Sequence, residues 1–493
     1  MKTIYLAYIF LVFAFLTACT KLERIDYTNI EEEEFFTTEA DVMSVLTNYY
    51  PIGMLWWNQY WWSHHVGYIS DAQSDMLLFN WINEVPGKLH RFVVTVNQNR
   101  LPNIYDNMIV KGISKGTNLI SKVQASPLKE EVKKSIIAQI RALRCNLALW
   151  GGDVFGGVPI MVDAEVLQEV YGKHYVRRST PAETCDFIVN EVDAIKNDLP
   201  DRYNRGSKDY GRATKGFVLT IKLKALMQQK RFVEAEATAR EIMTLGYGLV
   251  PEYHDIFTIE NEKNIETISS IPCLTNLDPS NNFNCEFGVY DYVYSNPNIT
   301  PWGCAKMEWA FYDTFDSLDT RRKDIIVDYI NKSGDHITRG IGNLERGAIV
   351  NLKYAVDPAA IGTRSGTDVI YFRYADVVLY LAEAINETSG PTQEALDLVN
   401  MIRARAFPDH PEKLLRLSDY GGDRQKFRDH IYKERGWELY FEGWRRSDMI
   451  RLDKMNDWGL HQNPSYNPYM QIWPIPPYII DQSEGIITQN PGY

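Results

Sequence analysis

The sequence predicts a mostly α-helical fold, in which tetratricopeptide-like helix pairs form a scaffold that carries long loop insertions and minor β-structure. Apolar residues recur with a period of 3.6 along most of the chain, which is typical of amphipathic helices. Two long stretches, about 49–100 and 251–350, lack this period and are rich in Asn, Asp, Gly, Pro and aromatic residues. Hydrophobic residues make up 45% of the 493 positions, which excludes an intrinsically disordered chain.

Two single helices are expected first. Apolar residues near 130–150 fall on one helix face, and Gly151-Gly152 is expected to stop that helix. Thr180-Pro181 has the pattern of an N-cap followed by proline in the first turn, so we expect a second helix to begin there. Leu199-Pro200 would end it, because the residue before a proline is disfavoured in helical conformation.

Helix pairs follow. Residues 211–246 have the pattern of one helix–turn–helix unit, close to the 34-residue length of a tetratricopeptide repeat, with small residues where the helices would touch. A second pair is expected at 370–402, broken at Gly390-Pro391. A long helix is expected at about 424–454, and the tail at 456–493 should wrap over the helices in extended form. Such pairs bury their apolar faces only by stacking on neighbours, which predicts a helical scaffold.

The N-terminus predicts export and lipid anchoring. Residues 4–16 are apolar and follow Lys2, a run too short to span a bilayer but of the length found in signal peptides. Leu16-Thr17-Ala18-Cys19 resembles a bacterial lipobox, in which the cysteine thiol is acylated and becomes the first mature residue. We therefore expect a signal peptide at 1–18 and a single lipid-anchored domain at 19–493, since no later segment resembles an interdomain linker.

The charge and the cysteines narrow the functions further. A formal net charge of −12 disfavours nucleic acid as a partner, because phosphate binding needs a concentrated basic surface. It also mildly disfavours a highly sulfated or uronate-rich ligand, although a local basic patch would override that. The cysteines lack metal-site spacing, and a disulfide among Cys273, Cys285 and Cys304 is left open.

Five motifs in order carry a family resemblance. Residues 434–451 read ERGWELYFEGWRRSDMIR, which is similar to the E-R-x-W-E-L-x-F-E-G-x-R-W-x-D-L-x-R signature of the SusD/RagB family, outer-membrane nutrient-binding lipoproteins of the Bacteroidetes. The other four are EFFTTEAD at 34–41, FGGVP at 155–159, DTRR at 319–322, and WPIP at 473–476 with the terminal QNPGY. One position departs from the pattern, because Arg446 stands where the family has Trp and Trp444 lies two places earlier.

The resemblance implies a binding function. It implies a surface lipoprotein that captures oligosaccharides or polysaccharide fragments and delivers them to a SusC-like TonB-dependent transporter. It implies neither enzyme activity nor a cofactor. Glu434, Glu438 and Glu442 recur every four residues with arginines nearby, and this pattern favours an ion-pair network over the acid–base pair of a glycosidase.

Aromatic side chains gather in the two loop-rich stretches, where the resembled family builds its glycan cleft. An aromatic ring offers a flat platform for the C–H face of a pyranose, while neighbouring polar groups bind its hydroxyls. Asp71 and Asp75 could also meet on one helix face and hold a structural Ca²⁺, although a cap or turn is the commoner role. The residues predicted to contact the ligand are Trp56, Trp61, Trp62, Asp75, Trp81, Tyr290, Tyr292, Tyr294 and Trp302.

Three alternative functions are left open by the sequence. The same architecture could bind oligopeptides, in which case the cleft would be lined with charge and free backbone edges. A surface glycoside hydrolase would release new reducing ends from a polysaccharide. A pure interaction scaffold would present an apolar surface that does not respond to glycans.

Overall fold

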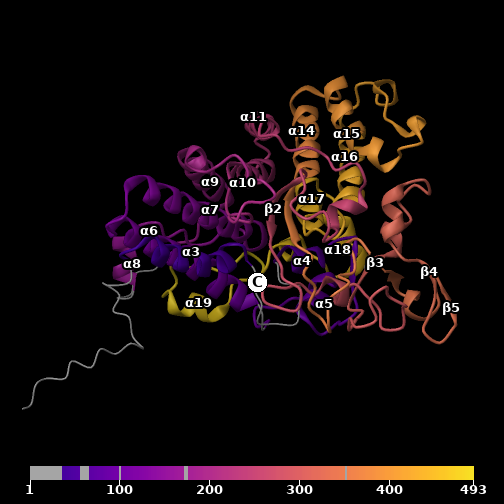
Figure 1. The fold of residues 1–493 in the computed structure, drawn as a ribbon, viewed down its shortest axis with the longest axis horizontal. Coiled ribbons are helices and arrows are strands. Elements are labelled where there is room, and N and C mark those ends of the chain that lie inside the picture. The colour runs from indigo at the N-terminus through magenta and orange to yellow at the C-terminus, as the bar shows by residue number, and fades with distance from the viewer. Residues whose placement is uncertain (1–35, 56–65, 99–100, 171–175, 350–351) are drawn as a thin grey trace, which may run out of the picture.

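The long helices form an array that fills the left and upper parts of Figure 1, a computed structural model that describes residues 36–55, 66–98, 101–170, 176–349 and 352–493. The array consists of α3 (Glu39–Gly53), α6 (Lys111–Ala125), α7 (Glu130–Phe155), α9 (Pro181–Ile195), α10 (Lys215–Gln228), α11 (Phe232–Met243), α14 (Tyr374–Ser389), α15 (Gln393–Ala406) and α16 (Arg424–Glu438). The order of packing follows the chain, with α7 on α9, α10 on α11 and α14 on α15. The two predicted helix pairs and the mostly helical fold are therefore confirmed.

Local capping explains where several of these helices begin. Thr180 Oγ1 accepts a hydrogen bond from the Glu183 amide at 3.2 Å, and the Glu183 carboxylate accepts one from the Thr180 amide at 2.9 Å. This capping box satisfies two amides that have no partner inside the helix. Thr214 caps α10 through the Phe217 amide. The predicted helix start at Thr180-Pro181 is confirmed.

Shorter helices and turns connect the array. The short helices are α4 (Val66–Asp71), α5 (Val85–His90), α8 (Ala164–Val170), α12 (Phe283–Glu286), α13 (Trp309–Tyr312), α17 (Arg445–Arg451), α18 (Met455–Gln462) and α19 (Pro477–Gln482). A π-helical segment spans Asn103–Val110. The 3₁₀ turns are Lys196–Asp198, His254–Phe257, Thr320–Asp324, Gly342–Leu344, Pro411–Lys413, Leu417–Asp419 and Pro468–Gln471.

A loop-rich insertion leaves the array after α11 and returns at α14. Strand β2 (Thr267–Ile271) follows α11 and pairs antiparallel with β7 (Val369–Arg373), which runs directly into α14. Because this pairing holds both ends together, α11 packs directly on α14 although the insertion separates them in sequence. The insertion itself carries β3 (Ala305–Glu308), β4 (Asp328–Ile330), β5 (His336–Thr338) and β6 (Gly347–Ala348), and β1 (Leu77–Phe79) adds to β3 from the other loop-rich stretch.

The prediction that Gly151-Gly152 ends the first long helix is wrong. Helix α7 continues through both glycines to Phe155 and ends at Gly156, whose φ of +73° gives a left-handed cap. Gly151 is needed for packing instead, since a Cβ there would lie 2.7 Å from Val158 Cγ1. The glycine therefore permits close approach inside the helix, a role that its sequence position alone does not reveal.

The single helix predicted at about 424–454 is also wrong. It divides into α16 and α17 because the chain turns between them, with Phe441 at φ +57° and Gly443 at φ +85°. The turn is held from a distance, since the Gly443 amide donates to the Asp71 carboxylate at 2.9 Å. The tail likewise contains α18 and α19 rather than being extended throughout, and Trp473 between them is fully buried.

Buried charges of the signature segment form the network that the sequence predicts. The Glu438 carboxylate contacts Arg321, Arg373 and Arg405 at 2.5–3.0 Å, and all four side chains are buried. The neighbouring carboxylates extend the network, with Glu434 on Arg321 and Arg403, and Glu442 on Arg373 and Lys353. These carboxylates are held by cations within the core, so their role is structural.

The position that departs from the family pattern also has a structural role. The Trp444 ring stacks on Trp150 with centroids 4.9 Å apart, and the Lys224 ammonium lies 3.4 Å from the Trp444 ring centroid. Arg446 is buried and bonds Asp153 Oδ2 at 2.9 Å and Gln73 Oε1 at 3.0 Å. The substitution of Arg for Trp therefore places a charge at this position, and that charge is paired.

The cysteines in the described part of the chain are free thiols. All are buried, and none pairs with another; they are Cys145, Cys185, Cys273, Cys285 and Cys304. Burial raises the pKa of these thiols, which keeps them protonated and unreactive. The disulfide that the sequence left open does not form. No helix among the described residues combines the length and the apolar character needed to cross a membrane.

Candidate functional site

Two predicted tryptophans from distant parts of the chain lie side by side. The ring centroids of Trp81 and Trp302 are 6.5 Å apart, with the ring planes inclined by 36°. The Trp81 side chain is 36% exposed and that of Trp302 is partly buried against the core. Phe79 contacts the Trp81 ring edge-on at 6.5 Å. The result is an aromatic surface that is supported from below and accessible from outside.

The strand register brings these two rings together. In the β1–β3 ladder Phe79 lies opposite Ala305, and the pairing continues beyond the strands through the Asn80 amide, which donates to Cys304 O at 2.8 Å. The Asn80 side chain also donates to Gly303 O at 2.9 Å. Residues 81 and 302 therefore lie on adjoining segments. Trp302 is fixed from its other side by its own amide, which donates to Cys285 O at 2.7 Å.

The predicted tyrosines lie along the next part of the insertion. Val289 packs beside Gly303, since a Cβ added at Gly303 would lie 3.7 Å from Val289 Cγ1. Tyr290 therefore follows directly after a residue that contacts the loop of Trp302. Tyr290 is 67% exposed. Tyr292 is half-buried and contacts Tyr294 and Tyr329 edge-on. These positions leave Tyr290 accessible to a ligand and Tyr292 accessible in part.

Two of the predicted contacts have internal partners instead. Tyr294 is buried, and its hydroxyl bonds both the amide and the carbonyl of Val289, so it braces the loop rather than facing a ligand. The Asp75 carboxylate receives two hydrogen bonds from Arg445, at 2.7 and 2.8 Å, and another from Tyr432. Its charge is therefore paired with Arg445 within the protein. The sequence does not reveal the role of Asp75, because Arg445 lies 370 positions away in the chain.

The calcium alternative has no support in the described part of the chain. Asp71 is buried and accepts hydrogen bonds from the backbone amides of Gly443 and Arg446, while Asp75 is held by Arg445. Burial raises the pKa of Asp71 to about 7, because it outweighs the hydrogen bonds from these amides, which lower that pKa. No group of three or more His, Cys, Asp or Glu residues that could hold a metal ion occurs among the described residues.

Four of the predicted positions cannot be placed. Trp56, Trp61 and Trp62 lie outside the described residues, as does the predicted lipid anchor Cys19. Phe79, which is buried and supports the Trp81 ring, is not among the residues that the sequence predicts. The alternation of a β-strand would have found it, since Phe79 and Trp81 are two positions apart and share a face.

A titratable pair, buried His90 and half-buried Glu308, lies next to the same sheet. His90 Nε2 is 3.4 Å from Glu308 Oε1, at the end of β3. Burial lowers the pKa of His90 to about 4 and raises that of Glu308 to about 7, where the Asp75 charge adds to the effect. Both shifts disfavour the charged forms, so this contact is not a strong ion pair.

Comparison with known proteins agrees with the architecture. A model of the SusD family matches residues 256–493. SusD-like protein P25 of Formosa agariphila is 25% identical over an alignment that covers 96% of this chain and 95% of that protein. SusD-like protein P38 of the same organism is 42% identical over 148 residues, which cover 30% of this chain and 24% of that protein.

Solved structures share the fold over nearly the whole chain. A SusD homologue from Bacteroides thetaiotaomicron superimposes with a TM-score of 0.80 at 20% identity, covering 94% of this chain and 99% of that chain. Surface glycan-binding protein A from the same species was solved in complex with laminarihexaose. It superimposes with a TM-score of 0.72 at 19% identity, covering 92% of this chain and 100% of that chain. Motif order, the family match over residues 256–493 and the architecture all agree with the resemblance to the SusD/RagB family.

Proposed function

We propose that this protein is a lipid-anchored outer-membrane surface protein that binds oligosaccharides and delivers them to a SusC-like TonB-dependent transporter. The observation that carries the binding function is the adjoining pair of exposed and partly exposed rings, Trp81 and Trp302. A ring face carries negative quadrupole charge and attracts polarised C–H groups of a sugar. Two rings side by side offer contact to more than one sugar unit.

Several further observations support this ligand class. Two proteins of the same fold are described as bound to laminarihexaose and as a laminarin-binding SusD-like protein. The platform lies on loops fixed by short strands, an arrangement that suits a binding site on a rigid scaffold. Tyr290, 67% exposed on the adjoining segment, would extend the contact surface. Trp56, Trp61 and Trp62 stay predicted ligand contacts.

The mechanism is binding without bond chemistry. Ring stacking supplies affinity, and polar groups around the rings select the hydroxyl pattern. The carboxylates of the signature segment, which were the candidate acid–base pair for a hydrolase, are buried and paired with arginines. Cys19, acylated at the mature N-terminus, would hold the domain on the membrane surface, where a transporter beneath it receives the ligand.

The proposal is tested by binding the mature protein to an array that carries both glycans and peptides. We expect binding to one class of glycan and no release of reducing ends from the bound polysaccharide. Binding to peptides alone would replace the ligand class with the oligopeptide alternative. New reducing ends would establish a hydrolase, and binding to neither class would favour an interaction scaffold.

A further inference from the structure

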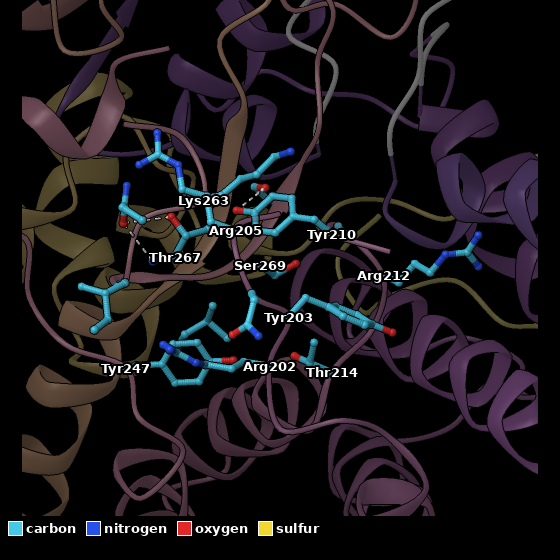
Figure 2. A pocket seen from close by; sticks show the side chains of 16 residues that line it. Arg202, Tyr203, Arg205, Tyr210, Arg212, Thr214, Tyr247, Lys263, Thr267 and Ser269 are labelled. Carbon is cyan, nitrogen blue, oxygen red and sulfur yellow. Dashed lines mark hydrogen bonds between the residues drawn. The ribbon is translucent and has the colours of Figure 1, made fainter. Parts of the chain in front are cut away.

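A cavity whose lining includes neither Trp81 nor Trp302 lies between the segment that leads into α10 and the segment that leads into β2 (Figure 2). Its volume is about 210 Å³, below the roughly 300–1,000 Å³ of pockets for drug-sized ligands, so it suits one small unit rather than a chain. Four of its lining residues are cationic, and none carries a carboxylate. The cations are Arg202, Arg205, Arg212 and Lys263.

Most of this positive charge is not neutralised by the contacts around it. Arg202 Nη1 donates to the carbonyl of Gly246 at 2.7 Å, and Arg205 Nη2 donates to the carbonyl of Glu260. A carbonyl is neutral, so each guanidinium keeps its full charge while being held in place. Arg212 differs, because its Nε lies 3.2 Å from Asp209 Oδ1, and its side chain lies to one side of the group in Figure 2.

Lys263 interacts electrostatically with two acidic groups, each of which also accepts a hydrogen bond from a backbone amide. Glu262 accepts a hydrogen bond from the Asp368 amide at 2.7 Å, and Asp368 accepts one from the Cys273 amide at 2.9 Å. Burial raises the pKa of Glu262 to about 7 and that of Asp368 to about 6, which reduces the negative charge they carry near neutral pH. The Lys263 ammonium itself lies 5.0 Å from the centre of the Tyr210 ring, on the wall of the cavity.

Three tyrosines line the cavity and provide aromatic faces on which a sugar ring can stack. Tyr203, Tyr210 and Tyr247 line it, together with the short polar side chains of Thr214 and Ser269 (Figure 2). The Tyr210 hydroxyl is held by Ser270 Oγ at 3.2 Å, and the Tyr247 hydroxyl donates to Asp201 O at 3.3 Å. Aromatic faces with fixed hydroxyls beside free guanidinium N–H groups match a ligand that is part ring and part anion.

We propose that this cavity binds the anionic unit of an acidic oligosaccharide, a sugar ring that bears a carboxylate or a sulfate ester. The planar guanidinium fork of arginine matches both groups, and Arg202 and Arg205 supply two such forks from one short segment. The inference rests on the proposed function, because it specifies the glycan class. It also shows how a chain with a net charge of −12 can take an acidic ligand, through a local basic cavity.

The test measures binding of glucuronate, glucose 6-sulfate and glucose to the full-length mature protein in detergent micelles, by calorimetry at low and high salt. One or both anionic sugars should bind at least tenfold more tightly than glucose, and the difference should shrink at high salt. The double variant Arg202→Gln/Arg205→Gln should lose at least tenfold in affinity for the anionic sugar. Lys208→Gln, an exposed position of the same segment outside the cavity lining, is the matched control and should change nothing.

The outcomes separate this inference from the function on which it rests. Equal binding of glucose and both anionic sugars, or affinity unchanged in the double variant, would overturn the inference. Inorganic sulfate that binds as tightly as the anionic sugars would also overturn it, because the ring would then contribute nothing. Laminarihexaose binding should be unaffected by the double variant, and if no glycan binds at all, the proposed function fails rather than this site.

Discussion

Replacement of Glu438 by Gln tests how much the buried charge network contributes to stability. The carboxylate lies 3.0 Å from Arg321, 2.5 Å from Arg373 and 2.6 Å from Arg405, with no exposed side-chain surface. Burial by itself raises the pKa of Glu438, but the three guanidinium groups outweigh it and lower the pKa from 4.5 to about 2. At about 1.4 kcal/mol per pKa unit, the ionised carboxylate contributes about 3 kcal/mol at pH 7.

Glutamine keeps the shape of the side chain but removes its charge. We expect Glu438→Gln to lower the free energy of unfolding by about 3–5 kcal/mol at pH 7, as when one member of a buried ion pair is lost. Urea unfolding followed by circular dichroism measures this difference. Glu130→Gln is the control, because the Glu130 side chain is 89% exposed, and surface changes of this kind stay within about 0.5 kcal/mol.

The pH dependence gives the sharper test of the reasoning. A depressed folded-state pKa gives stability that is present above the unfolded pKa and is lost as the pH falls toward the folded one. Between pH 7 and pH 3 the native protein should therefore lose about 2 kcal/mol through Glu438, and the gap to the variant should narrow by that amount. A gap below about 1 kcal/mol at pH 7, or one that does not change with pH, would refute the argument.

Three further predictions concern the backbone, the thiols and the anchor. Gly157→Ala should lower the free energy of unfolding by at least about 2 kcal/mol, because Gly157 has φ +129° and a Cβ would lie 1.9 Å from Ser179 O. Gly206→Ala, a position with open space around it, should be nearly neutral. Equal effects of the two variants in thermal unfolding would contradict this prediction. Ellman's reagent should react with the five described cysteines only after unfolding, since all five thiols are buried and have raised pKa values. Fast reaction in the native state would contradict their burial. Fewer than five reactive thiols after unfolding without reductant would contradict their being free. Cys19→Ala should abolish acylation and membrane retention in cells, measured by fractionation and mass spectrometry, and an acylated, membrane-bound variant would disprove the lipoprotein interpretation.

Local signals made the helical scaffold predictable. The capping residues Thr180 and Thr214 and the 3.6-residue period fix α9, α10 and α11 through contacts only a few positions apart. The break between α16 and α17 could not be predicted in this way. It depends on Asp71, more than 370 positions away in the sequence, which binds the Gly443 amide.

The candidate site could be predicted in its parts but not in its assembly. The aromatic content of the two loop-rich stretches indicates Trp81 and Trp302 separately, whereas their contact depends on the β1–β3 register. The same content cannot separate Tyr290 from Tyr294, because exposure is decided by the fold around Val289. The basic cavity was hidden by the net charge, since Arg202 and Lys263 meet only after folding.

The most direct test of the central claim is the affinity of Trp81→Ala and Trp302→Ala for laminarihexaose or for the glycan that the array identifies. With 36% of Trp81 exposed, a sugar face can cover about 90 Å², worth about 2 kcal/mol. We therefore predict affinity about 30-fold weaker for Trp81→Ala, a loss of similar size for Trp302→Ala, and no change for Tyr478→Ala, a control of matched exposure on α19. If both tryptophan variants bind the glycan as tightly as the native protein, the tryptophan pair is not the binding site.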